Sequence, residues 1–228
     1  MPRALTREFL MEGTLGTILA RAVPGLRILT EEERAASLRA VLAQRPPGSD
    51  GVWVFAYGSL IWNPTIHFLE RRPATAQGWH RAFCLGVKAG RGSPENPGLM
   101  LGLQPGGTCD GEAFLIAEAV MEHELSLLWR REMVADGYIP SWVRLEHEGA
   151  HFADAIAFTI NPQGANYCGN LSEDEVVRRL ATAQGGLGTA AEYLFRTRDG
   201  LRLLDMADPV VERLAKLVEA VRGVENNS

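Results

Sequence analysis

The hydrophobic pattern of the chain is strongest in the stretch 52–62. Its first half alternates the aromatic residues Trp53, Phe55 and Tyr57 with smaller side chains, and this period of two predicts a β-strand. The alternation stops at Gly58. A glycine at the end of a buried strand lets the backbone turn sharply and approach another group closely. Successive N–H groups in such a turn can bind an anion. The stretch alone is compatible with such a binding turn or with an ordinary buried strand and turn.

The chain before this strand has a different pattern. Residues 1–29 show weak periodicity and predict an irregular leader with room for a short helix. The run 30–33, Thr-Glu-Glu-Glu, is a capping box that begins a helix, and the Pro- and Gly-containing segment 45–48 predicts a linker after it. We therefore expect two parts, an N-terminal helical leader, residues 1–50, and a compact domain, residues 51–228.

The compact domain is predicted to contain strands first and helices later. Strands are expected at 52–57, 78–85, 99–103 and 111–116 and twice within 142–160, with turns at 105–107 and 148–149. Helices are expected at 118–134, from a capping box at Ser172 onward, at 188–204 and at 208–222. Mostly antiparallel strands followed by helices indicate an α+β fold with a barrel-like sheet.

Composition narrows the class of protein. Hydrophobic residues make up 46% and charged residues 22% of the 228 residues, which is typical of a soluble globular chain. The net charge of -5 argues against a nucleic-acid partner, and no apolar run approaches the roughly 20 residues of a membrane span. Cys84, Cys109 and Cys168 are far apart and odd in number. We interpret them as reduced thiols of a cytoplasmic protein.

Glu132 is the first candidate for catalysis. Met121, Leu125, Leu128 and Glu132 are spaced so that they share one stripe of the helix predicted at 118–134. A carboxylate on an apolar stripe is expensive to ionise, and the dipole near a helix C-terminus also disfavours negative charge. Both effects raise the pKa towards the range of a general acid or base. The alternative is a glutamate that reaches water or pairs with an arginine.

Two other motif matches lack the secondary structure that their function requires. His147 and His151 fit the His-Glu-x-x-His zinc motif, which requires both histidines on one helix face. The flanking residues alternate as strands and Gly149 disfavours a helix, so a hairpin turn is the better interpretation. The Gly-x-Gly-x-x-Ala letters at 186–191 follow a predicted helix at 176–183 rather than a strand. They therefore lack the context of a dinucleotide-binding loop.

A series of short motifs resembles the ChaC-type γ-glutamylcyclotransferases. In the order of that family, the matching pieces are 54–62, 78–83, 91–98, 106–111, 129–132 with 137–138, 166–169 and 192–194. They cover about 54–205 and leave the leader outside. The chain departs from the family pattern at Ala56, at Trp79 and in the segment 133–136. The resemblance implies a small mixed, mostly antiparallel β-barrel with surrounding helices.

The resemblance also implies an activity and a site. The implied reaction is cleavage of glutathione, or of a related γ-glutamyl peptide, to 5-oxoproline and a free amine, without cofactor or metal. The family's catalytic glutamate maps onto Glu132. The implied substrate-binding residues are Val54, Phe55, Ala56, Tyr57, Gly58, Ser59, Leu60, Arg91, Tyr138 and Tyr167.

The chemistry of this reaction suggests roles for these residues. The α-amino nitrogen of the substrate attacks its own γ-carbonyl, so one carboxyl group, assigned to Glu132, can take the proton and return it to the leaving amine. Backbone N–H groups of 58–60 suit the α-carboxylate or the developing oxyanion. The hydroxyl groups of the three tyrosines either face the substrate or belong to the core. Arg91 either binds the far carboxylate of the peptide or is a solvated loop residue.

Two other functions remain open from the sequence. The first is a non-catalytic binding or regulatory module on the same fold, associated with cation transport, because a fold alone does not establish catalysis. The second is a zinc hydrolase, which depends on the segment 147–151 alone. The oligomeric state and the role of the leader are not determined by any pattern in the chain.

Overall fold

A closed β-barrel forms the centre of the protein. The computed structural model describes residues 5–47 and 50–225, and within them five strands close into a barrel in the order β1-β3-β2-β4-β5. The strands are β1 (Gly51–Ala56), β2 (Glu70–Val87), β3 (Gly98–Ala117), β4 (Tyr138–His147) and β5 (Ala150–Ile160). Neighbouring strands are mostly antiparallel, and the barrel closes through parallel pairing of β1 with β5. The predicted α+β barrel is confirmed.

The long hairpin of β2 and β3 differs from the sequence prediction. Strands expected at 99–103 and 111–116 are one continuous strand, and the turn expected at 105–107 is wrong because this segment continues the strand that pairs with β2. Gly106 and Gly107 adopt φ angles of 100° and 74°, which are easy only for glycine. The two glycines therefore bend the strand without ending it.

The hairpin of β4 and β5 confirms the interpretation of the two histidines. Glu148 and Gly149 form its turn, with φ angles of 51° and 78°, as expected of a two-residue hairpin turn in which both residues have positive φ. His147 pairs with Ala150 across the ladder. The histidines therefore lie on two strands rather than on one helix face. β4 begins at Tyr138, earlier than the sequence indicated.

β1 lies at the centre of the hydrophobic core. Val54, Phe55 and Ala56 are 0% exposed, and every residue of the strand is buried. β1 pairs with β3 on one side and with β5 on the other, so both of its edges are covered. This position fixes the turn that follows the strand.

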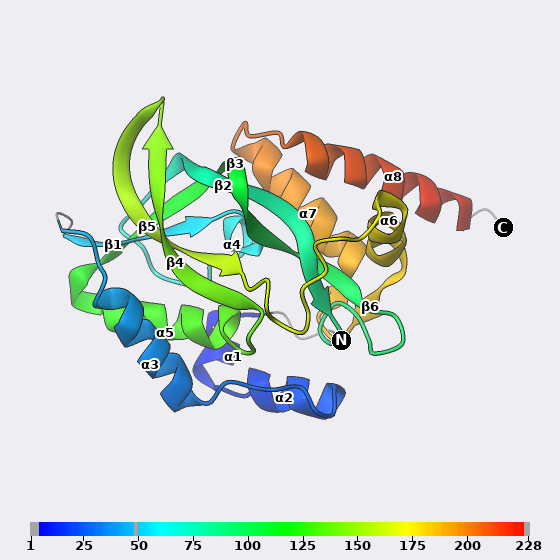
Figure 1. Ribbon diagram of the computed structural model, residues 1–228, viewed down its shortest axis with the longest axis horizontal. Helices are drawn as coiled ribbons and strands as arrows, with labels where there is room; N and C mark the ends of the chain where they lie inside the picture. The colour runs from blue at the N-terminus through cyan, green and yellow to red at the C-terminus, as the bar shows by residue number, and fades with distance from the viewer. Residues whose placement is uncertain (1–4, 48–49, 226–228) are drawn as a thin grey trace.

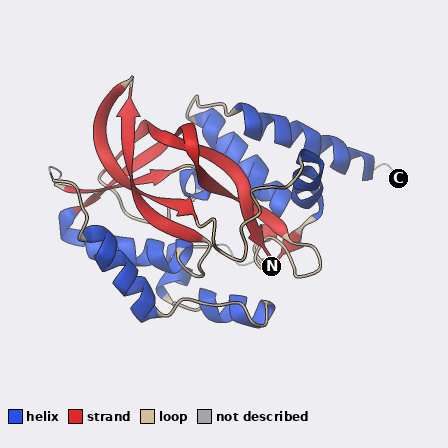
Figure 2. Cartoon of the chain, in the orientation of Figure 1, coloured by secondary structure: helices blue, strands red, loops and turns tan. Residues whose placement is uncertain are grey.

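Helices cover the barrel in two groups (Figures 1 and 2). The helices are α1 (Arg7–Met11), α2 (Leu15–Ala22), α3 (Glu31–Leu42), α4 (Ser59–Trp62), α5 (Met121–Glu132), α6 (Glu173–Thr182), α7 (Ala190–Leu203) and α8 (Pro209–Glu225), with a short 3-10 turn at Glu118–Val120 and a small β6–β7 ladder (Gln184–Gly185, Gly188–Thr189). Helices α1, α2, α3 and α5 lie on one side of the barrel, and α6, α7 and α8 lie on the other. In the described part of the chain, no helix combines the length and the apolarity that crossing a bilayer requires.

The two predicted capping boxes differ in how completely they form. At the start of α3, the Thr30 side chain accepts from the backbone of Glu33 and the Glu33 side chain accepts from the backbone of Thr30, so this box is complete. At the start of α6, the Ser172 side chain accepts from the backbone of Glu175. The carboxylate of Glu175 instead binds two arginines of its own helix. The second box is therefore half formed.

The leader is more regular than its sequence indicated. Residues 1–29 were predicted to be an irregular leader with room for a short helix; residues 1–4 lie outside the described residues, and the rest contain two helices, α1 and α2, which pack on α5. Phe9, Leu10 and Leu15 are buried in one cluster with Leu127. Short helices are marginal alone, so this packing against α5 stabilises them.

Candidate active site

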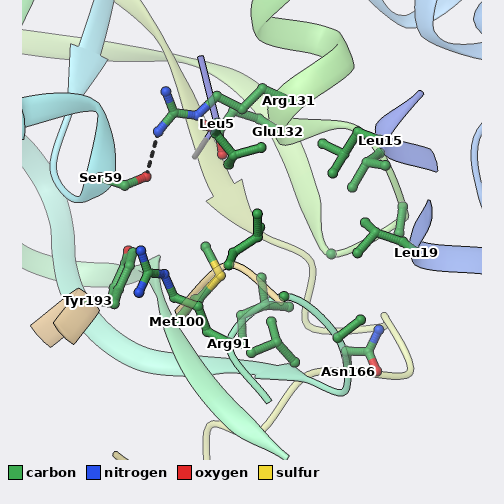
Figure 3. A pocket seen from close by; sticks show the side chains of 18 of the residues that line it. Leu5, Leu15, Leu19, Ser59, Arg91, Met100, Arg131, Glu132, Asn166 and Tyr193 are labelled. Atoms are coloured by element: carbon green, nitrogen blue, oxygen red, sulfur yellow. Dashed lines mark hydrogen bonds and ion pairs between the residues drawn. The ribbon is translucent and has the colours of Figure 1, made fainter. Parts of the chain in front are cut away.

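A cavity lies between the barrel and the leader. It has a volume of about 350 Å³, within the size range of small-molecule sites. Its walls come from α2, from the ends of β2 and α5, from the α4 turn and from α7. Figure 3 shows Glu132 and Arg131 on one wall, Arg91 and Met100 opposite them, and Leu15 and Leu19 across from Ser59 and Tyr193. A second hollow of about 20 Å³ lies beside the turn and shares Glu132 as a lining residue.

Glu132 lies where the helical stripe predicted. Met121, Leu125 and Leu128 are buried against the core, and Glu132 is the last residue of α5, with 12% of its side chain exposed. Its Oε1 atom is buried and accepts no hydrogen bond of good geometry. Burial raises the pKa of this carboxyl above its usual value. A buried carboxyl of raised pKa at a cavity is suited to proton transfer.

Arg131 links Glu132 to the turn after β1. Its Nε forms an ion pair with Glu132 Oε1 at 2.9 Å, and its Nη2 donates to Ser59 Oγ at 2.8 Å. Its Nη1 donates to Thr65 Oγ1 at 3.0 Å and to the carbonyl of Asn63. The positive charge lowers the pKa of Glu132 and so opposes the effect of burial. Burial dominates, because the pKa remains above its usual value.

The turn itself is formed by Gly58, the residue that precedes α4. A Cβ atom at this position would lie 3.0 Å from Tyr193 Oη and 3.5 Å from Leu101 Cδ1. The glycine therefore allows the backbone to pass close to these side chains. The first N–H groups of a helix have no partner within it, so those of Ser59 and Leu60 are available beside the smaller hollow that both residues line.

The other residues of the predicted binding stretch have different surroundings. Val54, Phe55 and Ala56 are fully buried in β1 and line neither of the two cavities. Tyr57 lines the smaller hollow, but its hydroxyl donates to the carbonyl of Phe158 at 2.6 Å. Within residues 54–60, the cavities are therefore bordered by the turn and not by the strand.

The remaining candidate tyrosines do not form one set. Tyr138 lines both cavities, and its hydroxyl donates to the carbonyl of Leu101 at 2.7 Å. Burial raises its pKa well above 10. Tyr167 lines neither cavity, and its hydroxyl accepts from Gln104 at 2.7 Å. Tyr193, which was not among the candidates, borders both cavities. Burial raises its pKa to about 12, so its hydroxyl stays protonated near neutral pH.

Arg91 lines the larger cavity from the loop after β2. Its Nη1 donates to the carbonyl of Thr189 at 2.8 Å and lies 3.4 Å from Glu192 Oε2. The guanidinium lies over the rings of Trp62 and Tyr193, at 6.0 Å and 5.6 Å from their centroids. Its side chain is 11% exposed. A held cation at a cavity wall can receive a carboxylate of a ligand.

The sequence did not predict that Arg131, Tyr193 and the leucines of the leader line this cavity. Arg131 stands directly before the candidate glutamate, and Tyr193 lies in the quoted piece 192–194, so both were within reach of the motif. The leucines of the leader carried no such signal, since their roles depend on how α2 packs across the chain.

Metal ligands do not cluster at the site among the described residues. In residues 5–47 and 50–225, no three His, Cys, Asp or Glu side chains gather as ligands of a metal ion would. All three cysteines are free. The groups at hand are a carboxyl of raised pKa, backbone N–H donors and two arginines.

Comparison with known proteins gives consistent matches. The model of the ChaC-like protein family matches residues 52–222. The glutathione-specific gamma-glutamylcyclotransferase of Escherichia coli (strain K12) is 42% identical over 204 residues, which are 90% of this chain and 87% of that protein. The glutathione-specific gamma-glutamylcyclotransferase 1 of Homo sapiens is 30% identical over 77% of this chain and 82% of its own. A crystal structure of the yeast γ-glutamyl cyclotransferase specific to glutathione superimposes with a TM-score of 0.69, at 22% identity, over 76% of this chain and 98% of that one.

Proposed function

The chain belongs to the ChaC-like family, and from this premise we propose that it is a γ-glutamylcyclotransferase that cleaves glutathione to 5-oxoproline and cysteinylglycine. The relatives named for this activity support the reaction and its substrate. The observation that carries the proposal is the buried carboxyl of Glu132, of raised pKa, at the wall of a cavity beside the Gly58 turn. Nothing in these observations favours the non-catalytic module.

The reaction needs orientation of the substrate and proton transfer from the attacking to the leaving nitrogen. The bond that forms joins the substrate's α-amino nitrogen to its γ-carbonyl carbon, and the bond that breaks joins that carbon to the cysteinyl nitrogen. Holding the amine against the carbonyl in the cavity supplies an effect that can reach about 7–11 kcal/mol in well-oriented systems. The nucleophile belongs to the substrate, so no side chain has to form a covalent bond.

We assign the proton transfer to Glu132. Its ionised carboxylate takes a proton from the α-ammonium, and the resulting carboxylic acid gives it to the leaving nitrogen. The attacking nitrogen loses a second proton as it becomes the lactam N–H, and the regenerated carboxylate passes this proton to the released amine. A raised pKa favours the second step, while Arg131, at 2.9 Å, keeps the ionised form accessible for the first. Proton uptake and release then occur at the same carboxyl group, which returns to its initial state.

The two ends of the γ-glutamyl peptide require different partners. The N–H groups of Ser59 and Leu60 are suited to the α-carboxylate or to the oxyanion that develops on the γ-carbonyl. Arg91 is suited to the carboxylate of the terminal glycine, since its cation lines the same cavity. Tyr138 and Tyr193 complete the wall between these positions.

The first test is direct. The purified protein is incubated with glutathione, and 5-oxoproline and cysteinylglycine are measured together. The proposal requires equal amounts of both products, because one bond cleavage produces one molecule of each. Formation of neither product, by a folded protein, would contradict the proposed function. A cytoplasmic location remains a prediction of the sequence, supported by the free thiols.

Replacing Arg131 should shift the pH dependence of the reaction. Arg131 lowers the pKa of Glu132, so Arg131→Met should raise that pKa further and leave less ionised base at a given pH. The acid limb of kcat/KM, which reports the free enzyme, should therefore move to higher pH. Buried Tyr57, Tyr138 and Tyr193 face the same region but stay neutral, since burial raises their pKa values.

Arg131→Lys is the matched control for this shift. Lysine keeps the positive charge but loses the fork that binds Ser59 and Thr65. The rate should fall while the acid limb stays near its wild-type position. An unchanged pH profile in Arg131→Met would show that Glu132 is not the group that titrates.

Chelation should leave the activity intact. The His-Glu-x-x-His motif has its histidines on the β4–β5 hairpin, and the described residues offer no cluster of three ligands. The proposed reaction also requires no metal-bound water. After dialysis against a chelator, 5-oxoproline release should remain within experimental error of the untreated protein. Loss of activity that zinc restores would instead support a metal-dependent hydrolase.

A further inference from the structure

One wall of the large cavity comes from the leader, which precedes the residues that the family model matches. The model match begins at residue 52, whereas α2, the residues after it and the residue at position 5 contribute an apolar wall. Its members, named here the leader wall, are Leu5, Leu15, Leu19, Val23 and Leu26. The family's reaction does not by itself explain why a carboxylate-rich peptide should meet five aliphatic side chains.

The leader wall is held firmly in place. Arg7 on α1 makes two hydrogen bonds to Glu124 of α5, at 2.6 Å and 2.7 Å, and Asn63 donates to the carbonyl of Leu5 at 2.8 Å. Farther along, the backbone N–H of Leu29 donates to the carbonyl of Val134 at 3.0 Å. These contacts anchor the leader on both sides of α2, so its leucines form a fixed surface of the cavity.

The cavity is therefore divided by polarity. Ser59, Arg131 and Glu132 form its reactive side, and the Leu15 and Leu19 side chains point into it from the other side (Figure 3). The γ-glutamyl end of a substrate carries the amine and carboxylate and must lie on the reactive side. The leaving half of the substrate then extends towards the leader wall.

We infer that the leader wall is a subsite for an apolar substituent on the cysteinyl sulfur, and that the protein also cleaves S-alkylated glutathione. This inference rests on the proposed function. The thiol side chain of glutathione is short, so it leaves most of an apolar wall in contact with water. An alkyl group on the sulfur would cover that wall, and burying apolar surface is favourable. The glycine carboxylate remains present for Arg91, which lines the same cavity.

The chemical step is the same as with glutathione. The α-amino nitrogen bonds to the γ-carbonyl carbon, the bond to the cysteinyl nitrogen breaks, and the proton passes to that nitrogen. The thioether is unchanged and leaves as S-alkyl-cysteinylglycine. No oxidant or additional reactant is needed.

The experiment compares kcat/KM for glutathione and for its S-methyl, S-butyl and S-hexyl derivatives, through release of 5-oxoproline. Each methylene buried against the wall should raise kcat/KM by about fourfold at most. S-butylglutathione should therefore exceed S-methylglutathione by on the order of tenfold, allowing for incomplete burial. The glutathione measurement tests the proposed function independently of this inference.

Two variants on α2 test whether the alkyl group binds at the leader wall. Leu19 is half-buried and lines the cavity, while Ile18, its neighbour on α2, is 37% exposed and does not. Leu19→Ser should lower the ratio of kcat/KM for S-butylglutathione to that for glutathione by on the order of tenfold. Ile18→Ser should leave that ratio and the activity with glutathione unchanged. Thermal melting of both variants shows whether each is folded.

Each result has a defined meaning. Turnover of glutathione without turnover of the S-alkyl derivatives would overturn the inference and leave the proposed function intact. A ratio that Leu19→Ser does not change would also overturn it, because the alkyl group would then lie elsewhere. Failure to release 5-oxoproline from all four substrates would instead refute the proposed function.

Discussion

Glu132→Gln is expected to lower kcat for glutathione by about 10²–10⁴-fold, the range typical of general acid–base catalysis. Glutamine preserves the size of the side chain and an oxygen that Arg131 can contact, but it cannot accept and return a proton. Binding should change much less, since the turn and Arg91 supply the contacts for the two carboxylates. The measurement is 5-oxoproline release at saturating and at limiting substrate.

The same substitution should leave the protein as stable as the wild type or more stable. Burial raises the folded-state pKa of Glu132 despite the neighbouring arginine. The stabilising contribution of this group is therefore present below the pKa of the unfolded chain and is lost as pH rises through the folded pKa. Above the folded-state pKa the ionised carboxylate opposes folding, and glutamine removes that cost. For a chain of this size, each kcal/mol gained raises the melting temperature by about 2–4 °C.

Glu112→Gln is a matched control. Glu112 on β3 is also a buried carboxyl of raised pKa, with an Oε2 atom that has no hydrogen-bond partner, but it lines neither cavity. Its replacement should leave turnover unchanged. Near wild-type turnover in a folded Glu132→Gln protein would show that the base is another residue. A large fall in its melting temperature would favour a structural role for Glu132.

Gly58→Val should lower kcat/KM by at least about 10²-fold, because small displacements of a positioning group have effects of this order. The first side-chain atom would already lie 3.0 Å from Tyr193 Oη. Two further methyl groups would then meet Tyr193 or Leu101, which are 2% and 1% exposed and have little room to move. The turn must shift, and the N–H groups of Ser59 and Leu60 shift with it. Kinetics with glutathione measure the effect.

Two additional substitutions test whether the loss of activity depends on the size and the position of the added side chain. Gly58→Ala adds only the Cβ atom, so its loss of activity should be smaller than that of valine. Gly186→Ala adds a Cβ atom with no neighbour within 4 Å and should leave activity unchanged. Overpacking at Gly58 should also destabilise the protein by about 1–3 kcal/mol, which thermal melting records. A Gly58→Val protein with wild-type kinetics would argue against any role of this turn in binding.

The elements that the sequence predicted best depend on local spacing. Alternation over 52–57 predicted β1, and the position of Glu132 after Leu125 and Leu128 predicted a carboxyl on a buried stripe. The capping box at Thr30 predicted the start of α3. In each case, residues a few positions apart determine the local structure, so a single sequence is enough to predict it.

The features that were missed depend on contacts between distant segments. Arg131 reaches Ser59 and Thr65, far away in the chain, and nothing in local periodicity indicates such a contact. The continuity of β3 through Gly106 depends on its pairing with β2. The helices of the leader likewise form against α5, so weak periodicity there predicted room for one short helix and did not locate α1 and α2.

The way the barrel closes also determines the order in which the site can assemble during folding. β2 and β3 form a hairpin of neighbouring segments, whereas β1 and β5 meet through Trp53 with Ala155 and Val54 with Ile156. Joining segments so far apart has a higher cost in loop-closure entropy and slows folding. The turn at Gly58 follows β1 directly, so we expect it to reach its final position only after β1 has joined the barrel. We therefore expect enzymatic activity to appear late in folding, after the long hairpin has formed.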